Sequence, residues 1–345
     1  MRRLPIFLVL DVSESMAGDN IRMLNKGLDA LLRSLRTDPH ALETVYLSVI
    51  VFAGKARTLT PLVELASFYP PRLPVGSGTS MGAALEHLMN EIDRNVVRST
   101  AERKGDWKPV VYLMTDGKPT DEVDEAIRRW KKHFSHRAAL VAIGIGNFAA
   151  LDTLQELSEH IFKLTAEDEA DFMKFIQWMS QSMSVQSRSV SADAVSTVSL
   201  AKIDETVLKM LDDITKAAKV DEDFVILTGK CQTTGLPYVM RYERAAFSET
   251  YSPSYYLNGI FPMEADYFEL SDDRVMARSI NSNALIGAPG CPHCGNPYGF
   301  AVCSCGGLMC IKGSGSAKCP WCGEEADFGM MDADSEGSDV TRSRG

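Results

Sequence analysis

The 345-residue chain contains no apolar run of the ~18 to 20 residues that a membrane-spanning helix needs. It also lacks an excess of basic residues, since the formal net charge is −10 and the isoelectric point is about 5.2. This balance argues against a protein that holds nucleic acid mainly by neutralising phosphates. The sequence has no internal repeat and no glycine-rich phosphate loop that ends in Lys-Ser or Lys-Thr. These absences leave proteins and ions as the expected partners.

The composition, with 45% hydrophobic and 24% charged residues, is that of a folded protein, and the length exceeds what one hydrophobic core usually fills. At least two domains are therefore expected. At the N-terminus, Met1-Arg2-Arg3 and the apolar run 4–10 superficially resemble a secretory signal. Because the run ends at Asp11 and no small-residue cleavage site follows, we interpret it as a first β-strand and expect a cytoplasmic protein.

Between residues 4 and 184, short apolar or β-branched runs alternate with longer segments of helical periodicity. This alternation predicts an α/β domain over 1–184, in which a doubly wound, mostly parallel sheet carries helices on both faces. The predicted strands are 4–10, 45–52, 110–114 and 139–145, and the predicted helices are 21–35, 82–97, 121–134 and 171–183.

Beyond residue 184 the composition changes. Residues 185–200 are rich in serine and have no sustained apolar period, which predicts a linker. Residues 201–329 are expected to form a β-rich C-terminal region that ends in a small zinc-binding domain over 286–329. Its other predicted elements are a helix over 203–217 and strands over 224–228 and 238–242. The acidic tail, 330–345, is expected to be disordered because it consists largely of Gly, Ser and Asp.

A candidate divalent-cation motif follows the first predicted strand. In Asp11-Val-Ser13-Glu-Ser15, the two-residue spacing turns one carboxylate and two hydroxyls to the same side of an extended segment. Two further candidates are Thr79, in a glycine-rich segment, and Asp116, which follows another predicted strand. Ligands collect at the carboxyl ends of the strands in an open parallel sheet. Two carboxylates and three hydroxyls would leave room for one external ligand on a hard cation such as Mg2+.

The order of these residues resembles the metal-ion-dependent adhesion site of von Willebrand factor A domains, whose fold is Rossmann-like. The resemblance implies that the three hydroxyls bind Mg2+ or Mn2+, that the two carboxylates bind it directly or through water, and that a partner's Asp or Glu completes the shell. The implied ligands are Asp11, Ser13, Ser15, Thr79 and Asp116. The alternative interpretation is that the two serines cap the following helix and that Asp116 is a turn residue.

Glu14 lies between the two serines, where many members of the family carry glycine. The expected role of the site is binding and not catalysis. The two carboxylates that could act as a general base are implied ligands, and the motif segments contain no histidine.

A closer resemblance extends over most of the chain, with the linker and residues 200–280 matching less well. The segments that carry it are Arg3-Leu-Pro, Ala41-Leu-Glu-Thr44, Leu65-Ala-Ser-Phe68, Gly105-Asp-Trp-Lys-Pro109, Gly287-Ala-Pro-Gly-Cys-Pro-His-Cys-Gly295 and Cys319-Pro-Trp-Cys-Gly323. They resemble the TerY proteins of tellurium-resistance gene clusters. This resemblance implies an adaptor that works with a metal-dependent protein phosphatase and a protein kinase in a phosphorylation-linked stress response.

Seven of the eight cysteines lie between Cys291 and Cys322, which in a reducing compartment indicates metal binding and not disulfides. Cys291-Pro-His-Cys294 and Cys319-Pro-Trp-Cys322 form a pair of knuckles, each followed by a glycine that permits a tight turn. Their four sulfurs would satisfy one tetrahedral Zn2+ with no open position, as in a structural site.

The four remaining cysteines could form a second zinc site if the first of them folds back onto the others. They are Cys231, Cys303, Cys305 and Cys310. The alternatives are that His293 supplies a fourth ligand, or that these thiols are free and buried as small hydrophobic groups. One or two zinc ions are therefore expected.

Two other functions remain open at this point. A metal-dependent hydrolase of phosphate esters would require an open metal position near a general base. Nucleic-acid binding through a zinc ribbon would require basic residues, but Lys312 and Lys318 are the only ones between Cys291 and Cys322.

Overall fold

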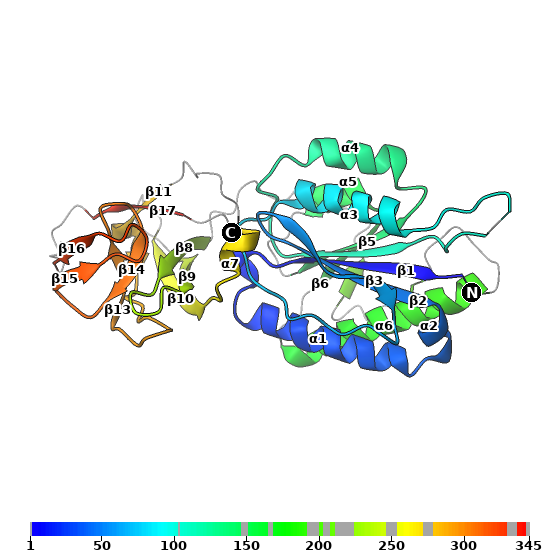
Figure 1. Cartoon of the computed structure of the whole chain (residues 1–345), viewed down its shortest axis with the longest axis horizontal. Helices are drawn as coiled ribbons and strands as arrows, with labels where there is room; N and C mark the ends of the chain where they lie inside the picture. The colour runs from blue at the N-terminus through cyan, green and yellow to red at the C-terminus, as the bar shows by residue number, and fades with distance from the viewer. Residues whose placement is uncertain are drawn as a thin grey trace. The chain divides into compact units, whose positions relative to one another are not determined.

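The computed structural model describes residues 2–102, 104–145, 151–164, 168–191, 200–202, 208–210, 224–245, 254–271, 279–329 and 337–342 (Figure 1). The chain forms two compact units. The first consists of Met1–Val12, Gly18–Leu73 and Thr79–Lys219, and the second of Ser13–Ala17, Pro74–Gly78 and Val220–Gly345. Two five-residue segments, 13–17 and 74–78, therefore belong to the second unit although their neighbours in sequence belong to the first.

A seven-stranded sheet forms the centre of the first unit, in the order β3-β2-β1-β4-β5-β6-β7. Neighbouring strands are parallel except at the two edges, where β2–β3 and β6–β7 are antiparallel. The strands are β1 (Leu4–Asp11), β2 (Val45–Phe52), β3 (Ala56–Glu64), β4 (Val110–Thr115), β5 (Ala139–Ile145), β6 (His160–Leu164) and β7 (Leu208–Met210). The predicted doubly wound, mostly parallel fold is confirmed.

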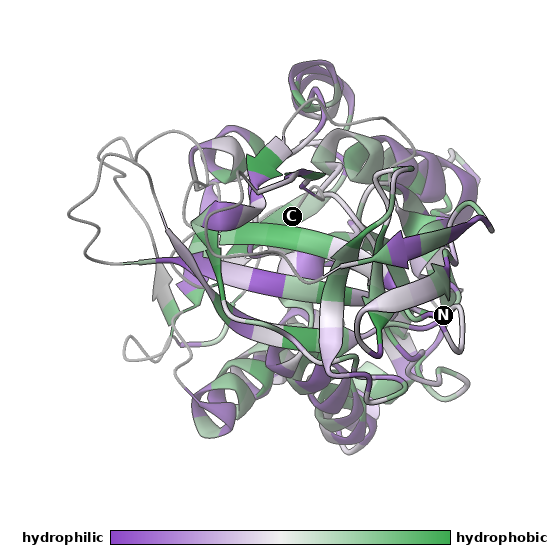
Figure 2. Cartoon of the chain, turned by 90° about the vertical axis from the view of Figure 1, so that its left-hand side faces the viewer, coloured by the Kyte–Doolittle hydropathy of each residue, from purple (hydrophilic) through white to green (hydrophobic). Residues whose placement is uncertain are grey.

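Helices cover both faces of this sheet (Figure 1). Helices α1 (Asp19–Arg36), α2 (Pro39–Thr44) and α6 (Glu169–Ser191) lie on one face, and α3 (Met81–Asn95), α4 (Asp124–His133) and α5 (Leu151–Leu157) lie on the other. The helices are amphipathic, with hydrophilic and hydrophobic residues on different sides (Figure 2). Such a helix is stabilised mainly by burial of its apolar side against the sheet. Among the described residues, no helix has the length and apolar character that crossing a membrane requires.

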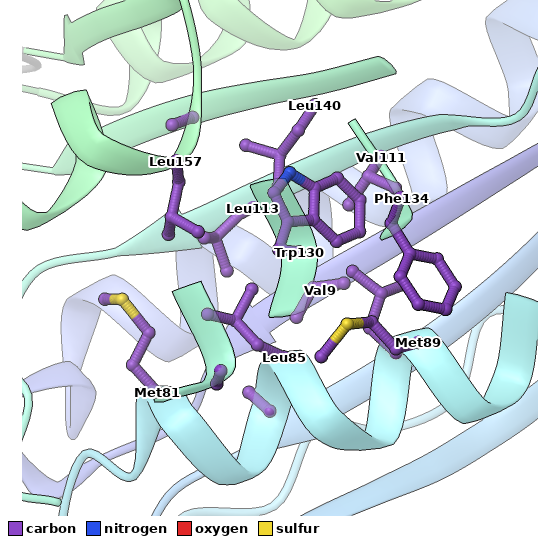
Figure 3. Close-up of a cluster of buried hydrophobic side chains, with 14 of the residues drawn as sticks. Val9, Met81, Leu85, Met89, Val111, Leu113, Trp130, Phe134, Leu140 and Leu157 are labelled. Carbon is purple, nitrogen blue, oxygen red and sulfur yellow. The ribbon is translucent and has the colours of Figure 1, made fainter. Parts of the chain in front are cut away.

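The core under α3 and α4 shows why these runs form strands and helices (Figure 3). Alternate residues of β1, such as Val9, point into it, and so does Leu113 of β4. Leu85 of α3 and Trp130 of α4 pack against them from the helices. Trp130 stacks on Phe134 with ring centroids 5.9 Å apart. Burial of these side chains fixes the position of β1 and β4 in the middle of the sheet.

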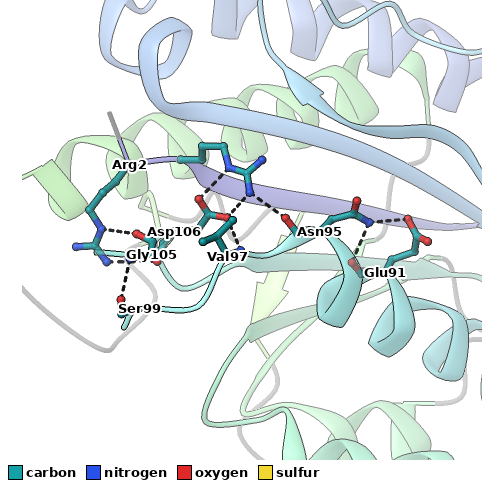
Figure 4. Close-up of polar contacts among 8 residues, drawn as sticks. Arg2, Glu91, Asn95, Val97, Ser99, Gly105 and Asp106 are labelled. Carbon is teal, nitrogen blue, oxygen red and sulfur yellow. Dashed lines mark hydrogen bonds and ion pairs between the residues drawn. The ribbon is translucent and has the colours of Figure 1, made fainter. Parts of the chain in front are cut away.

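The segment after α3 is tied to the start of β1 (Figure 4). The Arg3 guanidinium pairs with Asp106 at 2.5 Å and also donates to the Asn95 carbonyl. The Asp106 carboxylate, only 6% exposed, accepts a further hydrogen bond from the Val97 amide. This network lies at the N-terminal end of β1, so it stabilises the sheet at the end opposite Asp11.

The segment predicted as a serine-rich linker is partly helical, because α6 continues to Ser191. A serine of this segment explains the difference, because the Ser187 hydroxyl lies 2.7 Å from that of Thr44 in α2. Earlier in the same helix, Ser180 donates to the Ser34 hydroxyl of α1 at 2.6 Å. Small hydroxyl residues let α6 approach its neighbours closely while their polar groups stay paired. Residues 192–199 lie outside the described residues.

The helix predicted over 203–217 is wrong in the part that is described. Residues Leu208–Met210 form strand β7, which extends the sheet beside β6. The rest of the predicted helix lies outside the described residues.

The second unit contains a six-stranded sheet in the order β12-β10-β9-β8-β14-β13. Pairs β8–β14 and β10–β12 are parallel, and the other neighbours are antiparallel. The strands are β8 (Phe224–Lys230), β9 (Pro237–Arg244), β10 (Tyr255–Pro262), β12 (Leu285–Ile286), β13 (Tyr298–Val302) and β14 (Leu308–Ile311). A separate hairpin joins β15 (Gly315–Lys318) to β16 (Glu325–Phe328). The prediction of a β-rich C-terminal domain is confirmed.

The tail predicted to be disordered contains an ordered strand. Strand β17 (Asp339–Thr341) pairs antiparallel with β11 (Ser279–Asn281). Val340 in its middle is 1% exposed and belongs to the core of the second unit. A single buried valine in a polar segment is too weak a sequence signal to predict this pairing. Residues 330–336 and 343–345 lie outside the described residues.

Candidate metal centres

The end of β1 lies at the point where the order of the sheet reverses. From β1 the chain proceeds to β2 and β3 on one side, and later to β4, β5 and β6 on the other. Leu10 is in register with Met114, so Asp11 and Thr115 are the next pair at the carboxyl ends of the two strands. The Thr115 hydroxyl donates to Asp11 Oδ2 at 2.6 Å, and both residues are buried. Ligands bind at such a switch point in open α/β sheets.

Thr79 presents a buried oxygen that has no hydrogen-bond partner among the described residues. Its side chain is 1% exposed, and Oγ1 is unpaired. The backbone is fixed, because the Thr79 amide donates to the Thr120 hydroxyl at 3.0 Å and its carbonyl accepts from the Thr120 amide at 2.9 Å. Buried hydroxyls in native proteins nearly always have a partner. The unpaired Oγ1 therefore suits a cation ligand.

Asp116 directly follows β4 and is half-buried, and Gly117 follows it. A side chain at Gly117 would place its Cβ 3.3 Å from Thr79 Oγ1. The glycine thus lets the turn after β4 pass close to the Thr79 hydroxyl. Sequence reasoning identified Asp116 but missed Thr115 and Ser80. Ser80 Oγ is also buried and unpaired among the described residues.

The two serines of the motif belong to the second unit, with their hydroxyl oxygens 3.0 Å apart. Mg2+ with ligands at about 2.1 Å in an octahedron places neighbouring ligand oxygens about 3.0 Å apart. The pair therefore has the spacing of two adjacent ligands. The capping alternative is not supported, because Gly18 is the N-cap of α1 and Ser13 makes no side-chain capping bond to the short helix Glu14–Met16.

The eight cysteines form two groups of four sulfurs, each with all sulfurs within 4.8 Å of one another. The inner cluster consists of Cys231, Cys291, Cys294 and Cys310, and the outer cluster of Cys303, Cys305, Cys319 and Cys322. Three sulfur pairs lie 3.6, 3.9 and 3.8 Å apart. Tetrahedral zinc with Zn–S bonds of about 2.3 Å requires sulfurs about 3.8 Å apart. Both clusters therefore fit a zinc ion, so that of the one or two zinc ions expected from the sequence the structure supports two.

The predicted grouping of these ligands differs from the structure. The two Cys-x-x-Cys knuckles, predicted to share one ion, belong to different clusters. The cause is the parallel pairing of β14 with β8, in which Met309 lies opposite Lys230, so that Cys310 and Cys231 come next. His293 is not in either cluster, because its Nε2 bonds the Pro237 carbonyl at 2.8 Å.

Four similar turns present the sulfurs. In each, the amide of a left-handed glycine donates to the carbonyl of the first cysteine, at 2.8 to 3.0 Å. The pairs are Cys231 with Gly235, Cys291 with Gly295, Cys303 with Gly306, and Cys319 with Gly323. The first of these turns has the sequence Cys-Gln-Thr-Thr-Gly and lacks a second cysteine. The spacing Cys-x-x-x-Gly is the signal that could have identified Cys231 as part of a knuckle.

One thiol in each cluster has a lowered pKa. Burial acts to raise the pKa of Cys231, but hydrogen bonds from the Thr234 hydroxyl and from the amides of Thr234 and Thr233 lower it to about 6. The Cys305 amide is the main cause that lowers the pKa of Cys303 to about 7. Zinc binds the thiolate, so these hydrogen bonds favour metal binding at Cys231 and Cys303. The pKa values of four other thiols, Cys291, Cys305, Cys310 and Cys322, are raised.

Comparison with known proteins finds two families along the chain. Residues 6–178 match the family model of the von Willebrand factor type A domain, and residues 221–345 match that of the TerY-C metal binding domain. No curated protein matches the chain significantly.

Solved structures with a similar fold include proximal thread matrix protein 1 from the mussel byssus, at 19% identity and a TM-score of 0.39 over 53% of this chain and 48% of that one. A structure of the same protein with a zinc-occupied MIDAS motif matches at 18% identity and a TM-score of 0.38, again over 53% of this chain and 48% of that one. The chain thus spans about half the length of the mussel protein. A von Willebrand factor type A protein from Catenulispora acidiphila matches at 14% identity and a TM-score of 0.41, over 80% of this chain and 70% of that one.

Proposed function

Because the chain belongs to the von Willebrand factor type A family and ends in a TerY-C metal binding domain, we propose that it is a non-catalytic adaptor that captures a protein partner through a bound Mg2+ or Mn2+. Domains of this family are typically interaction modules. The proposed ligands are Asp11, Ser13, Ser15, Thr79 and Asp116. A carboxylate of the partner takes the remaining position on the ion.

The unpaired Thr79 hydroxyl carries this proposal. A buried oxygen without a partner costs about 1–3 kcal/mol, and a cation would remove that cost. The hydrogen bond from Thr115 holds the Asp11 carboxylate in one orientation, as an outer-shell partner of a metal ligand does. The serine hydroxyls have the spacing of neighbouring ligands. Oxygen-only ligands of this kind suit Mg2+ and Mn2+.

The two cysteine clusters support a structural and not a catalytic role for zinc. Each offers four sulfurs, which fill a tetrahedral shell and leave no position for substrate or water. All eight cysteines are free thiols, which suits a reducing compartment such as the cytoplasm.

The partner system is proposed from the resemblance to TerY proteins alone. By resemblance to TerY proteins, the captured partner is a metal-dependent protein phosphatase or a protein kinase of a tellurium-resistance-like stress response. The chemistry proposed for the site requires only that the partner present an Asp or Glu to the cation.

The test is Mn2+ binding to the zinc-loaded full chain, measured by electron paramagnetic resonance. Thiolate clusters favour zinc, so Mn2+ reports on the oxygen site. Thr79→Val, which keeps the shape but removes the hydroxyl, should weaken Mn2+ binding by more than the about 10- to 100-fold that loss of an outer-shell partner causes. Asp116→Ala should also remove capture of the purified phosphatase or kinase partner.

Thr58→Val is the matched control, since this hydroxyl on β3 bonds His87 of α3 and is not a proposed ligand. It should leave Mn2+ binding unchanged. Absence of Mn2+ binding by the wild-type chain, or equal affinity of wild type and Thr79→Val, would contradict the proposed site.

A further inference from the structure

Glu14 is a buried carboxylate that the proposed metal shell does not use. It lies between Ser13 and Ser15 in the sequence, at a position where glycine is common in the family, and its side chain is 0% exposed. A buried carboxylate is costly unless hydrogen bonds compensate for the loss of water. A glutamate buried at this position therefore needs hydrogen-bond donors nearby.

Two hydroxyl groups of the second unit donate to the same oxygen of Glu14. The Thr228 hydroxyl, on β8, donates to Oε1 at 3.1 Å, and the Tyr267 hydroxyl, on the short helix α7 (Tyr267–Leu270), donates to it as well. The two hydroxyl oxygens lie 2.9 Å from each other. Burial, and next the Glu14 charge, raise the pKa of Tyr267 well above its usual value. Its hydroxyl therefore stays protonated and can donate.

Apolar contacts within the second unit surround this hydrogen-bonded group. Ala17 and Val75, from the two short segments of that unit, pack with Ile226 of β8 and Tyr267. The other members of this apolar cluster are Val239, Phe261 and Met263. The Arg241 guanidinium also donates to the Ser15 carbonyl at 3.4 Å. The segment 13–17 is thus held at the Glu14 side chain, at the Ser15 carbonyl and at Ala17.

We propose that Glu14 is a positioning residue, which holds the hydroxyls of Ser13 and Ser15 in place for the cation. This inference rests on the proposed function. Thr228 and Tyr267 supply the anchor, and the rigid segment keeps the two serine oxygens 3.0 Å apart. A glycine at position 14 would avoid the cost of burying a charge but would leave the segment free to adopt other backbone conformations. Each of those conformations would separate the two ligands.

The deciding experiment compares two tyrosine variants of the zinc-loaded full chain. Tyr267→Phe removes one of the two donors to Glu14, at a residue far in sequence from every proposed ligand. Tyr238→Phe is the matched control, because this buried tyrosine of the same unit donates to the Gly299 carbonyl and does not bond Glu14. Tyr267→Phe should weaken Mn2+ binding about tenfold, the lower range for loss of an outer-shell partner. Tyr238→Phe should leave it unchanged.

Two substitutions of Glu14 itself separate the hydrogen bonds from the charge. Glu14→Gly should weaken Mn2+ binding about 10- to 100-fold. Glu14→Gln should retain most of the wild-type affinity, because its amide oxygen can accept from both hydroxyls. Zinc content and melting temperature, measured on each variant, identify loss of folding. If Glu14→Gly does not fold, the two tyrosine variants still decide.

The outcomes also separate this inference from the function on which it rests. Wild-type chain that binds no Mn2+ would overturn both. Wild-type chain that binds Mn2+, with Glu14→Gly equal to it or with both tyrosine variants equally weakened, would overturn only the positioning role of Glu14.

Discussion

The inner and outer cysteine clusters each consist of four cysteine sulfurs, but the surroundings of the two clusters differ. Three of the inner cysteines are buried and the fourth is half-buried, whereas two of the outer cysteines are exposed. The inner ligands follow β8, precede β13 and lie within β14. The outer ligands all lie within 303–322, in the β13–β14 turn and in the turn between β15 and β16. The inner ion would therefore join distant parts of a sheet, and the outer ion would close a local structure.

The alternation of β14 explains how one strand serves both clusters. Leu308 and Cys310 point into the core that contains the inner cluster, while Met309 and Ile311 point into the core around the outer one. Successive side chains of a strand point to opposite faces. The position of Cys310 along β14 therefore decides which face of the sheet it lies on, and so which cluster it joins. Its spacing from other cysteines in the sequence does not decide this.

The largest expected effect comes from the loss of an inner ligand. Cys231→Ser should reduce the zinc content from two ions to one and greatly destabilise the second unit. The inner ion holds β8 beside β14, and structural zinc is worth ~10 to 16 kcal/mol. Zinc content by mass spectrometry and urea unfolding of the second unit measure the two results.

Cys322→Ser provides the comparison, because it also removes one ligand but from the outer cluster. It should likewise reduce the zinc content to one ion while β8, β9 and β14 stay folded. If the two substitutions destabilised the second unit equally, burial and position of the clusters would not determine how much each ion stabilises it.

A smaller effect is expected on the rate at which zinc leaves the wild-type chain. A chelator should remove one ion before the other, since Cys305 and Cys322 are exposed and the inner sulfurs are largely covered. Zinc release followed with a colorimetric indicator should show two phases. The fast phase should be absent from Cys322→Ser and present in Cys231→Ser. A single phase in the wild type would contradict the difference in access.

Much of the first unit could be predicted from sequence because its strands are continuous apolar runs. Val45–Phe52 and Ala139–Ile145 have the predicted bounds. Strand β3 was missed because it lies at an edge of the sheet, where its residues are only partly buried and include Pro61. The end of α6 was predicted as a linker because composition alone does not reveal that the Ser187 hydroxyl pairs with that of Thr44 in α2.

The zinc ligands show a different limit. All eight cysteines were candidates from the sequence, four because local spacing marks two Cys-x-x-Cys knuckles and four because they remained. Their grouping was not, because it depends on the pairing of β8 with β14, two strands far apart in sequence. For the same reason no sequence pattern could connect Glu14 with Tyr267.

The smallest expected effect tests whether the two units depend on metal to different degrees. The Arg3–Asp106 pair stabilises the first unit without any ion, at the end of the sheet opposite Asp11. Asp106→Asn should destabilise this unit by about 1.5–3 kcal/mol, the contribution of a hydrogen bond to a charged group. The second unit should keep both zinc ions and its own unfolding midpoint. If Asp106→Asn also lowered zinc content, the stability of the clusters would depend on the first unit, and the contrast between a zinc-independent unit and a zinc-dependent one would fail.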